Sequence, residues 1–513
     1  MKNCAPHQLV FLLLGLLNTT IAQTCMANRA ESVQPHIVII TVDDMSADSV
    51  GVMGCELPDT TPRMDKLAGE GLRFNLAHVQ VGNCMPGRNV MWSGRFPHNN
   101  GVEGFYQVKT ARHPMLSDLM QQAGYFTAIR GKVSHSTPYI PYNWDLIIQK
   151  NSNGTTAHVK DAASYGDSTK QAIDASAAAK KPLCLLINIS DPHKPFFAQG
   201  KTGATIEDPH KPTRVFTADE VPIPGFLFDD PVVRKELAHY YSSVRRADDC
   251  VGEILDTIDR CGIREHTVVI FLSDHGMALP FAKTQLYHHS THTPLFVRWP
   301  EKIAANRVDN RHMVSAVDFL PTILDIAGAD HPPELDGRSF HALLNGQSQE
   351  KRHFVVKEYN ENAGGSRDPM RAVQSKRYLY IYNPWSNGER IFATATSGTP
   401  TYKRFKELAT ADSAYAQRHD IYQHRVVEEL YDVMADPNCL NNLIQSPEHD
   451  EALTLHRRRL QTWMRNTGDP MLQIYKDREN VDKREAYIQK LERVSQERRS
   501  KKNTNKKNNQ NNK

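Results

Sequence analysis

The segment HIVIITVDD, residues 36–44, decides the fold class of this 513-residue chain. Its first part, His36–Val42, is rich in apolar and β-branched residues and stops abruptly at Asp43 and Asp44. Such a run predicts a strand that is buried on both faces, because β-branched side chains pack well on a pleated surface. The two aspartates would then stand at the carboxyl end of that strand.

Three further apolar runs end in polar residues in the same way. They are Phe126–Arg130, 183–189 and 268–272, and helical patterns over 61–71, 115–123 and 314–328 lie between the strand-like runs. This alternation predicts an α/β fold with a large, mostly parallel sheet flanked by helices. Ligands of such sheets bind beyond the carboxyl ends of the strands. The polar residues that follow the runs are therefore candidates for a site.

The character of the sequence changes near residue 350. Residues 371–382 indicate a strand or hairpin arm, and Leu430-Tyr431-Asp432 leads into a helical stretch. We expect four parts: an export signal at 1–22, a large domain at 35–350, a smaller C-terminal α+β subdomain at 351–480, and a charged, disordered tail at 481–513.

The N-terminus has the features of a secretory signal. Met1-Lys2 precedes an apolar run over residues 9–17, and Thr20-Ile21-Ala22 is a small-x-small cleavage pattern. The run is too short to span a bilayer, and no later stretch of about 20 apolar residues follows. We therefore expect an exported protein without a transmembrane segment, secreted, periplasmic or lysosomal.

Charge argues against a nucleic-acid partner. The net charge is +4, but residues 494–513 hold seven basic residues against one Glu, which leaves the rest of the chain at −2. No aromatic motif is interleaved with the basic residues, as single-stranded nucleic-acid binders require. The excess charge belongs to the tail rather than to a binding surface.

The sequence permits disulfide bonds and glycosylation at several residues. Export permits disulfides among the remaining cysteines, whose pairing the sequence leaves undetermined, although Cys184 lies in an apolar run and is expected as a buried thiol. Asn-x-Ser/Thr sequons occur at Asn18, Asn153 and Asn188, of which the first leaves with the signal.

The motif Cys84-Met85-Pro86-Gly87-Arg88 is the most specific feature of the chain. A proline shortly after Cys84 suits the first turn of a helix, whose free N–H groups favour anions. Arg88 stands four residues later and can share a helix face with Cys84. The motif therefore predicts an anion pocket that contains a reactive sulfur, with a buried structural cysteine as the alternative for so short a motif.

With the downstream Gly94-Arg95, this motif resembles the signature of the type I sulfatases, in which the cysteine is oxidised to formylglycine. The resemblance implies an alkaline-phosphatase-like fold, modification of Cys84 by a formylglycine-generating enzyme, and a sulfated oligo- or polysaccharide substrate. A hydrated aldehyde carries two hydroxyls, so one can attack sulfur while the other later expels sulfate. Gly87 departs from the Ser or Ala that is usual in the family.

Two residue pairs at strand ends, Asp43-Asp44 and Asp274-His275, resemble the calcium ligands of the family. By this resemblance Asp43, Asp44, Asp274 and His275 hold one Ca²⁺, together with a hydroxyl of the modified Cys84. Carboxylate oxygens are the ligands that hard cations prefer. His275 stands where Asn is more common, and imidazole also suits softer metals.

Four other residues resemble family positions that bind the sulfate group and transfer protons. Lys132 and Lys283, with Arg88, would neutralise charge on the sulfuryl oxygens. By resemblance, His193 would protonate the leaving group and His135 would take a proton as sulfate is eliminated. The loop that carries Lys283 also contains His288, His289 and His292. We expect these three histidines only to line the rim of the site.

The resemblance runs from about residue 35 to 465 and narrows the substrate class. The segment from Asp274 to Pro294 is most similar to the N-sulfoglucosamine sulfohydrolases, the heparan sulfamidases. The 132–135 segment and Asp274-His275-Gly276 also resemble iduronate-2-sulfatase. Both imply heparin-like glycans, and algal polysaccharide sulfates stay open because specificity depends on loops.

Two other functions remain open at this point. A phosphate or phosphonate monoester hydrolase of the alkaline-phosphatase superfamily would share the sheet and the cation site but would use an unmodified nucleophile. A non-catalytic, glycan-binding pseudo-sulfatase would lack a catalytic residue, whereas all the residues that can be transferred are present.

Overall fold

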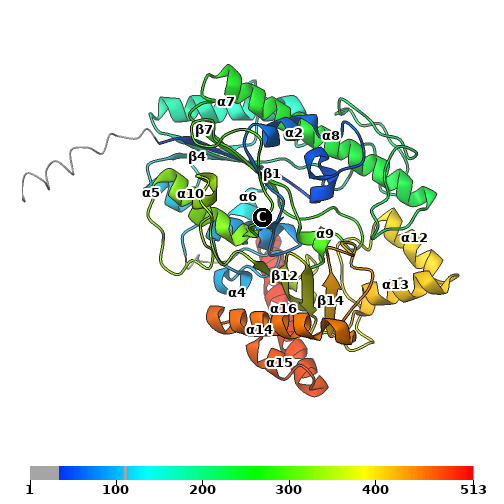
Figure 1. The fold of residues 1–513 in the computed structure, drawn as a ribbon. Coiled ribbons are helices and arrows are strands. Elements are labelled where there is room, and N and C mark those ends of the chain that lie inside the picture. The colour runs from blue at the N-terminus through cyan, green and yellow to red at the C-terminus, as the bar shows by residue number, and fades with distance from the viewer. Residues whose placement is uncertain (1–33, 109–112, 512–513) are drawn as a thin grey trace, which may run out of the picture.

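The computed structural model of the protein describes residues 34–108 and 113–511, with side chains as far as residue 501 (Figure 1). The export signal expected at 1–22 lies outside these residues. None of the described helices is long and apolar enough to cross a membrane.

An eight-stranded mixed sheet forms the centre of the fold. Its first five strands are mutually parallel, β8 is antiparallel to both of its neighbours, and β2 and β9 pair in parallel. The mostly parallel sheet predicted from the sequence is confirmed. The order of strands is β5 (Leu146–Ile148), β4 (Phe126–Arg130), β6 (Leu183–Asn188), β1 (His36–Val42), β7 (Thr267–Ser273), β8 (Leu295–Arg298), β2 (Leu72–Phe74) and β9 (Arg307–Asp309).

Strand β1 separates two hydrophobic cores. Val38, Ile40 and Val42 pack into one core and Ile37 and Ile39 into the other, and all five are fully buried. The alternation follows from the period of two along a strand. Helices α2 (Pro62–Gly69), α7 (Ala162–Ala178) and α8 (Pro231–Arg260) cover the first face, and α3 (Cys84–Ser93), α5 (Leu116–Gln122) and α10 (Phe319–Ala327) cover the second (Figure 1).

A four-stranded antiparallel sheet dominates the C-terminal region, in the order β11 (Phe354–Glu361), β12 (Arg367–Ser375), β13 (Tyr378–Tyr382) and β14 (Glu428–Asp432). One face, which includes Tyr380, packs on α14 (Asp450–Thr467) and α15 (Leu472–Lys476). On the other face Ala372 and Ile381 join the same core as α8. The two sheets therefore share a hydrophobic core.

The remaining elements are short or peripheral. They are β3 (Ala77–His78), β10 (Val314–Ser315), α4 (Pro97–Asn100), α6 (Val133–Ser136), α9 (His288–Thr291), α11 (His341–Leu344), α12 (Pro400–Ala409), α13 (Ser413–His424), α16 (Val481–Asn511), and the 3-10 turns η1 (Ala47–Ser49), η2 (Gly51–Met53), η3 (Ala316–Asp318) and η4 (Pro447–His449).

The helix predicted over 314–328 begins later than expected. Val314 and Ser315 form strand β10, which pairs in parallel with β3, and α10 starts only at Phe319. Ser315 and Asp318 form a capping box around the intervening 3-10 turn. Because a capping box satisfies free N–H groups at the start of a helical segment, it separates the strand from the helix.

Within the charged tail expected at 481–513, residues Val481–Asn511 form helix α16. Ile488 and Ser495 are buried, and the Ser495 hydroxyl donates to the Gly365 carbonyl oxygen. Arg484 donates to the carbonyl oxygen of Ser386. These buried positions are sparse along a charged helix, so composition alone concealed the face that docks on the C-terminal sheet.

Candidate active site

Side chains from β1, β7 and α3 converge at one edge of the large sheet. Ligand-type atoms of Asp43, Asp44, Cys84 and His275 all lie within 4.8 Å of one another, and all four residues are buried. Strands β1 and β7 are parallel neighbours, so the residues that follow them meet at the same edge. Cys84 is the first residue of α3, as its motif predicted.

Hydrogen bonding fixes how His275 faces this cluster. Its Nδ1 lies 3.0 Å from the Gly276 carbonyl oxygen, which can only accept, so Nδ1 carries the proton. The lone pair of Nε2 then points into the cluster, 3.1 Å from Asp44 Oδ1 and 3.2 Å from Cys84 Sγ. Orientation of an imidazole by a backbone carbonyl is typical of metal-ligating histidines.

The cluster fits a divalent cation. Both carboxylate oxygens of Asp43 are buried and have no hydrogen-bond partner, although Lys132 forms an ion pair with one of them. Buried acceptors that lack donors are costly, and a cation among them removes that cost. Two carboxylates suit a hard cation such as Ca²⁺, and the imidazole extends the range to softer metals.

Asp274 lies beside the cluster and outside its shared volume. Its Oδ2 accepts from Arg88 Nε at 3.1 Å, and its Oδ1 accepts from the backbone N–H of Asp44 at 3.1 Å. The same Oδ1 is 3.7 Å from His275 Nε2. The structure thus brings Asp274, itself an expected metal ligand, next to the other four, with one of its oxygens engaged by Arg88.

Arg88 is fully buried and held from three sides. Its Nη1 donates to Thr41 Oγ1 at 2.8 Å and to Asn188 Oδ1 at 2.5 Å. Its Nη2 forms ion pairs with Asp274 Oδ2 at 3.1 Å and with Asp43 Oδ1 at 3.5 Å, although neither contact has hydrogen-bond geometry. This end of the guanidinium is therefore oriented toward the carboxylates.

Two lysines complete the cationic side of the site. Lys283 Nζ donates to both oxygens of Asp44, at 2.7 and 2.6 Å, from the loop after β7. Lys132 pairs with Asp43 from a left-handed position, φ 49°, directly after β4 and Gly131. The three buried carboxylates thus face three cationic side chains.

The two expected proton-transfer histidines lie nearer the surface. His193 follows β6 and its Nδ1 lies 2.6 Å from the Lys194 carbonyl oxygen, which leaves Nε2 for proton exchange. His135 lies on α6 and its buried Nδ1 has no hydrogen-bond partner. Both are half-buried, whereas the carboxylates are fully buried. The site is therefore deepest at the cation cluster and shallowest at the histidines.

Burial and the opposing charges set the protonation of these groups. Burial favours the neutral acid, yet Lys132, His193 and Arg88 hold the pKa of Asp43 well below its usual range. Burial and the Asp43 carboxylate raise the pKa of Asp274 to about 6 and the pKa of the Cys84 thiol well above its usual range. Burial, with Lys132 and Arg88, lowers the pKa of His135 to about 3.

The pKa values of the two lysines and of His193 also depend on burial and on neighbouring charges. Burial opposes the charged form of Lys283, but the Asp44 carboxylate raises the pKa of this lysine. Lys132 has its pKa raised by Asp43 in the same way, against burial. Burial lowers the pKa of His193, and Asp44 only partly offsets that.

Sequence reasoning missed the residues that hold the site in place. Asn188 was noted only as a glycosylation sequon, yet it is buried, accepts from Arg88, and its amide donates to the Gly131 carbonyl oxygen. Asp191 binds Lys160 and Arg246, which fixes the segment that carries His193. Asn188 is the last residue of β6 and Asp191 follows three residues later. Their position at the carboxyl end of a predicted strand was the feature that could have indicated a role in the site.

The six cysteines within the described residues, Cys84 among them, are all free thiols. Cys184 is fully buried, as expected from its apolar run. Of the histidines near Lys283, His288 and His292 are stacked with ring centroids 4.8 Å apart. They lie on and after α9, outside the carboxylate cluster.

Comparison with protein-family models gives two matches. A model described as sulfatase matches residues 35–329. A second, described as N-sulphoglucosamine sulphohydrolase, C-terminal, matches residues 274–389. The first covers more than half of the chain and contains every candidate site residue.

Individual proteins give the same similarity. An ulvan-active sulfatase of Formosa agariphila is 27% identical over 445 residues, which cover 86% of this chain and 82% of that protein. The N-sulphoglucosamine sulphohydrolase of Homo sapiens is 27% identical over 453 residues, or 80% and 86%. A solved structure in complex with its substrate D-glucosamine-2-N,6-O-disulfate has a TM-score of 0.62 at 18% identity, covering 85% and 99%, and shares the fold.

Proposed function

The chain belongs to the sulfatase family of sulfuric ester hydrolases, and we propose that it removes sulfate from a sulfated, heparin-like glycan. In this proposal Cys84 is oxidised to formylglycine by a formylglycine-generating enzyme before the protein acts. The observation that carries it is the convergence of Cys84 and Arg88 with the buried carboxylates at the ends of β1 and β7.

Two groups complete the proposed site. Asp43, Asp44 and His275, with the modified Cys84 and Asp274 at their side, would hold one Ca²⁺, which supplies Lewis-acid stabilisation of negative charge when bound. The hydrated aldehyde of formylglycine supplies two geminal hydroxyls, one for attack on sulfur and one for the later release of sulfate.

The chain's own cations hold the sulfuryl group. Arg88 Nη2 faces Asp43 and Asp274, and Arg88 lies on the same helix as Cys84, so we assign to Arg88 the donation of a hydrogen bond to a sulfuryl oxygen. Lys132 and Lys283 flank the carboxylates from opposite strand ends. These fixed charges would stabilise the transition state more than the ground state, because they need no reorganisation as charge develops.

The two histidines move the protons. We assign protonation of the leaving atom to His193 Nε2, since its Nδ1 is held by the Lys194 carbonyl oxygen. His135 would take the proton from the second hydroxyl as sulfate leaves. Its Nδ1 has no partner within the described residues, which suits a group that must exchange a proton.

The substrate class follows from the C-terminal match. Because residues 274–389 resemble the C-terminal part of N-sulphoglucosamine sulphohydrolase, we propose an N-sulfated glucosamine unit as the target. The ulvan-active relative keeps algal polysaccharide sulfates as the second candidate. A panel of N-, 2-O- and 6-O-sulfated heparin disaccharides and sulfated ulvan oligosaccharides, assayed for sulfate release, separates these substrates.

Residues 35–350 carry the chemistry in this proposal, and the subdomain at 351–480 closes one side of the site. The Ala395 backbone N–H donates to Thr284 Oγ1, beside Lys283. Tyr287 at the end of that loop donates to Glu429 on β14. We further propose that residues 1–22 direct export, so that the mature protein is secreted, periplasmic or lysosomal.

Replacing Cys84 by Ala tests the proposal directly. We expect sulfate release to fall by at least about 10⁴-fold, the scale on which loss of a catalytic nucleophile acts, with an unchanged circular dichroism spectrum. Cys184→Ala, which removes a buried thiol outside the site, is the matched control and should keep its activity. Comparable turnover in Cys84→Ala would refute the role of Cys84.

Mass spectrometry of the peptide that contains residue 84 distinguishes a sulfatase from a phosphate or phosphonate monoester hydrolase. An aldehyde in place of the thiol supports the sulfatase mechanism. An intact thiol in fully active protein would instead favour a phosphate or phosphonate monoester hydrolase with an unmodified nucleophile. A protein that carries the aldehyde but releases no sulfate from any substrate of the panel would favour the pseudo-sulfatase.

A further inference from the structure

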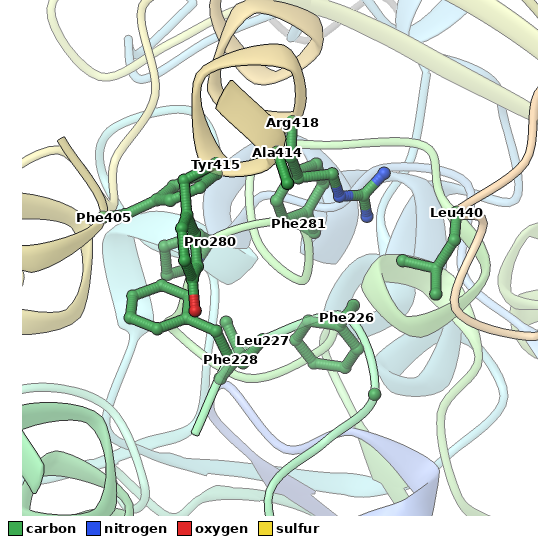
Figure 2. Close-up of a pocket in the computed structure, with 11 residues that line it drawn as sticks. Phe226, Leu227, Phe228, Pro280, Phe281, Phe405, Ala414, Tyr415, Arg418 and Leu440 are labelled. Atoms are coloured by element: carbon green, nitrogen blue, oxygen red, sulfur yellow. The ribbon is translucent and has the colours of Figure 1, made fainter. Parts of the chain in front are cut away.

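A second hollow lies beside the loop that carries Lys283, and none of the candidate active-site residues lines it (Figure 2). Its volume is about 260 Å³. Four parts of the chain form its walls: the segment at 225–228, the loop at 280–281, helices α12 and α13 of the C-terminal region, and Leu440. The hollow is therefore built by the fold, from segments far apart in the sequence.

Five of the eleven residues that line it are aromatic. Phe228 packs against Phe405 and Tyr415, with ring centroids 5.5 and 5.4 Å apart. Phe281 closes the next side, 6.3 Å from Phe405. Figure 2 shows these rings around a common space, with Phe226 on the far side from Tyr415. Such a wall favours a flat, apolar ligand, because aromatic rings stack face to edge or offset.

One charged group lines the pocket, Arg418 of α13. Its guanidinium lies over the Phe281 ring, 3.9 Å from the centroid, and its Nη1 donates to the Cys439 carbonyl oxygen at 3.1 Å. Its Nη2 has no hydrogen-bond partner within the described residues, and the side chain is one of those that line the pocket. A guanidinium without a carboxylate partner on the wall of a pocket can pair with an anionic group of a ligand.

These features restrict the chemistry of the ligand. A sugar ring would bring many hydroxyls, and the aromatic wall offers few partners for them. The volume is also below the roughly 300–1,000 Å³ of sites for drug-sized ligands. One or two fused rings with a single anionic group satisfy both the wall and Arg418.

We propose that this pocket binds a small aromatic carboxylate. Its ring lies between Phe228, Phe405 and Tyr415, and its carboxylate pairs with the Arg418 guanidinium. The proposal is independent of the sulfatase chemistry, because the pocket uses none of the catalytic or metal-binding residues.

Binding of 2-naphthoate to the full-length protein tests the proposal, followed by calorimetry and by the fluorescence of the probe. We expect saturable binding at one site per chain. The neutral 2-naphthylmethanol should bind more weakly, and acetate, which lacks the ring, should not compete. Absence of saturable 2-naphthoate binding, or equal binding of the neutral probe, would overturn the proposal.

Two variants assign the contacts. Arg418→Met should weaken 2-naphthoate about 10-fold or more, the scale of a charge-assisted hydrogen bond, and leave 2-naphthylmethanol unchanged. Tyr415→Ala should weaken both probes. Arg404→Met is the matched control, since Arg404 lies on α12, pairs with Asp230 and does not line the pocket.

Retained binding of the neutral probe shows that Arg418→Met has kept the pocket folded. If Arg418→Met binds 2-naphthoate as tightly as the unmodified chain, the carboxylate does not meet Arg418 and the proposal is wrong. Sulfate release enters neither measurement, so these outcomes are separate from those of the Cys84 experiment.

Discussion

Two of the buried charge clusters within the described residues differ in how completely their polar atoms are satisfied. In the first, the carboxylate site, both oxygens of Asp43 and Nη2 of Arg88 form ion pairs but no well-formed hydrogen bond, and the buried Nδ1 of His135 has no hydrogen-bond partner. The second, which we call the Glu358 cluster, comprises His98, Glu358, Arg371 and Asp469.

The Glu358 cluster has donors for its carboxylates. Glu358 accepts from His98 Nδ1 at 2.7 Å and from Asn360 at 2.8 Å, and Arg371 lies 3.3 Å from it. Arg371 Nε also donates to Asp469 at 2.5 Å. No side-chain polar atom of the four cluster residues is buried without a partner.

This difference distinguishes a cluster that binds a ligand from one that only stabilises the fold. Both clusters bury carboxylates against arginines, so burial of charge is common to both and identifies neither as a site. Unsatisfied groups that converge on one volume mark the carboxylate site, because their cost persists unless a ligand is bound there. The Glu358 cluster instead joins α4, the C-terminal sheet and the segment after α14.

The largest expected contrast comes from Asp43→Asn. We expect kcat/KM for sulfate release to fall by at least about 10³-fold, because the change removes a proposed cation ligand and several kcal/mol of charge stabilisation. The variant should also lose the increase in Tm that added Ca²⁺ gives to the unmodified protein. Full activity in Asp43→Asn would remove the functional distinction between the two clusters.

Arg371→Met should have the opposite profile. It leaves Glu358 and Asp469 buried without their guanidinium, so we expect a loss of about 3–5 kcal/mol in the free energy of unfolding. Urea denaturation measures this loss. Activity per folded molecule should stay within about threefold of the unmodified protein, as expected for a residue that contacts neither substrate nor reacting atoms. A collapse of kcat in the folded fraction would place the Glu358 cluster in the catalytic machinery.

The smallest effect is expected from pH at His98. Burial lowers the pKa of His98, but Glu358 raises it above the usual value, so the charged form is favoured in the folded state. Its contribution to stability is then fully present below about pH 6.5 and is lost as pH rises through the folded pKa. Burial raises the pKa of Glu358, but Arg371 and His98 bring it to about 2, so its contribution is kept above about pH 4.5.

We therefore expect the stability difference between the unmodified protein and His98→Gln to shrink above pH 6.5, by about 1 kcal/mol. Urea midpoints between pH 5.5 and 8.5 measure it. A difference that stays constant over this range would mean that His98 is neutral throughout and that the ion pair with Glu358 does not form.

Much of the sheet could be predicted from the chain because local patterns determine it. The strand at Phe126–Arg130 has the predicted bounds, and the helix that starts at Cys84 was indicated by Pro86. Each depends on side-chain shape and on neighbours a few residues away, so a short window of sequence carries the information. The charged composition of residues 481–513 did not show where helix α16 docks, because its contacts are with the C-terminal sheet, far away in the sequence.

The sequence by itself determined which residues carry the chemistry and at which strand ends they stand. The parallel order of β4, β6, β1 and β7 then brought those ends together. Only the tertiary structure decided how each group is used: it placed Asn188 against Arg88 rather than at the surface, and one oxygen of Asp274 on Arg88. It also formed the Arg418 pocket from segments that are far apart in the sequence. The reason is physical, since hydrogen-bond satisfaction and cavity shape depend on residues hundreds of positions apart, which no local pattern records.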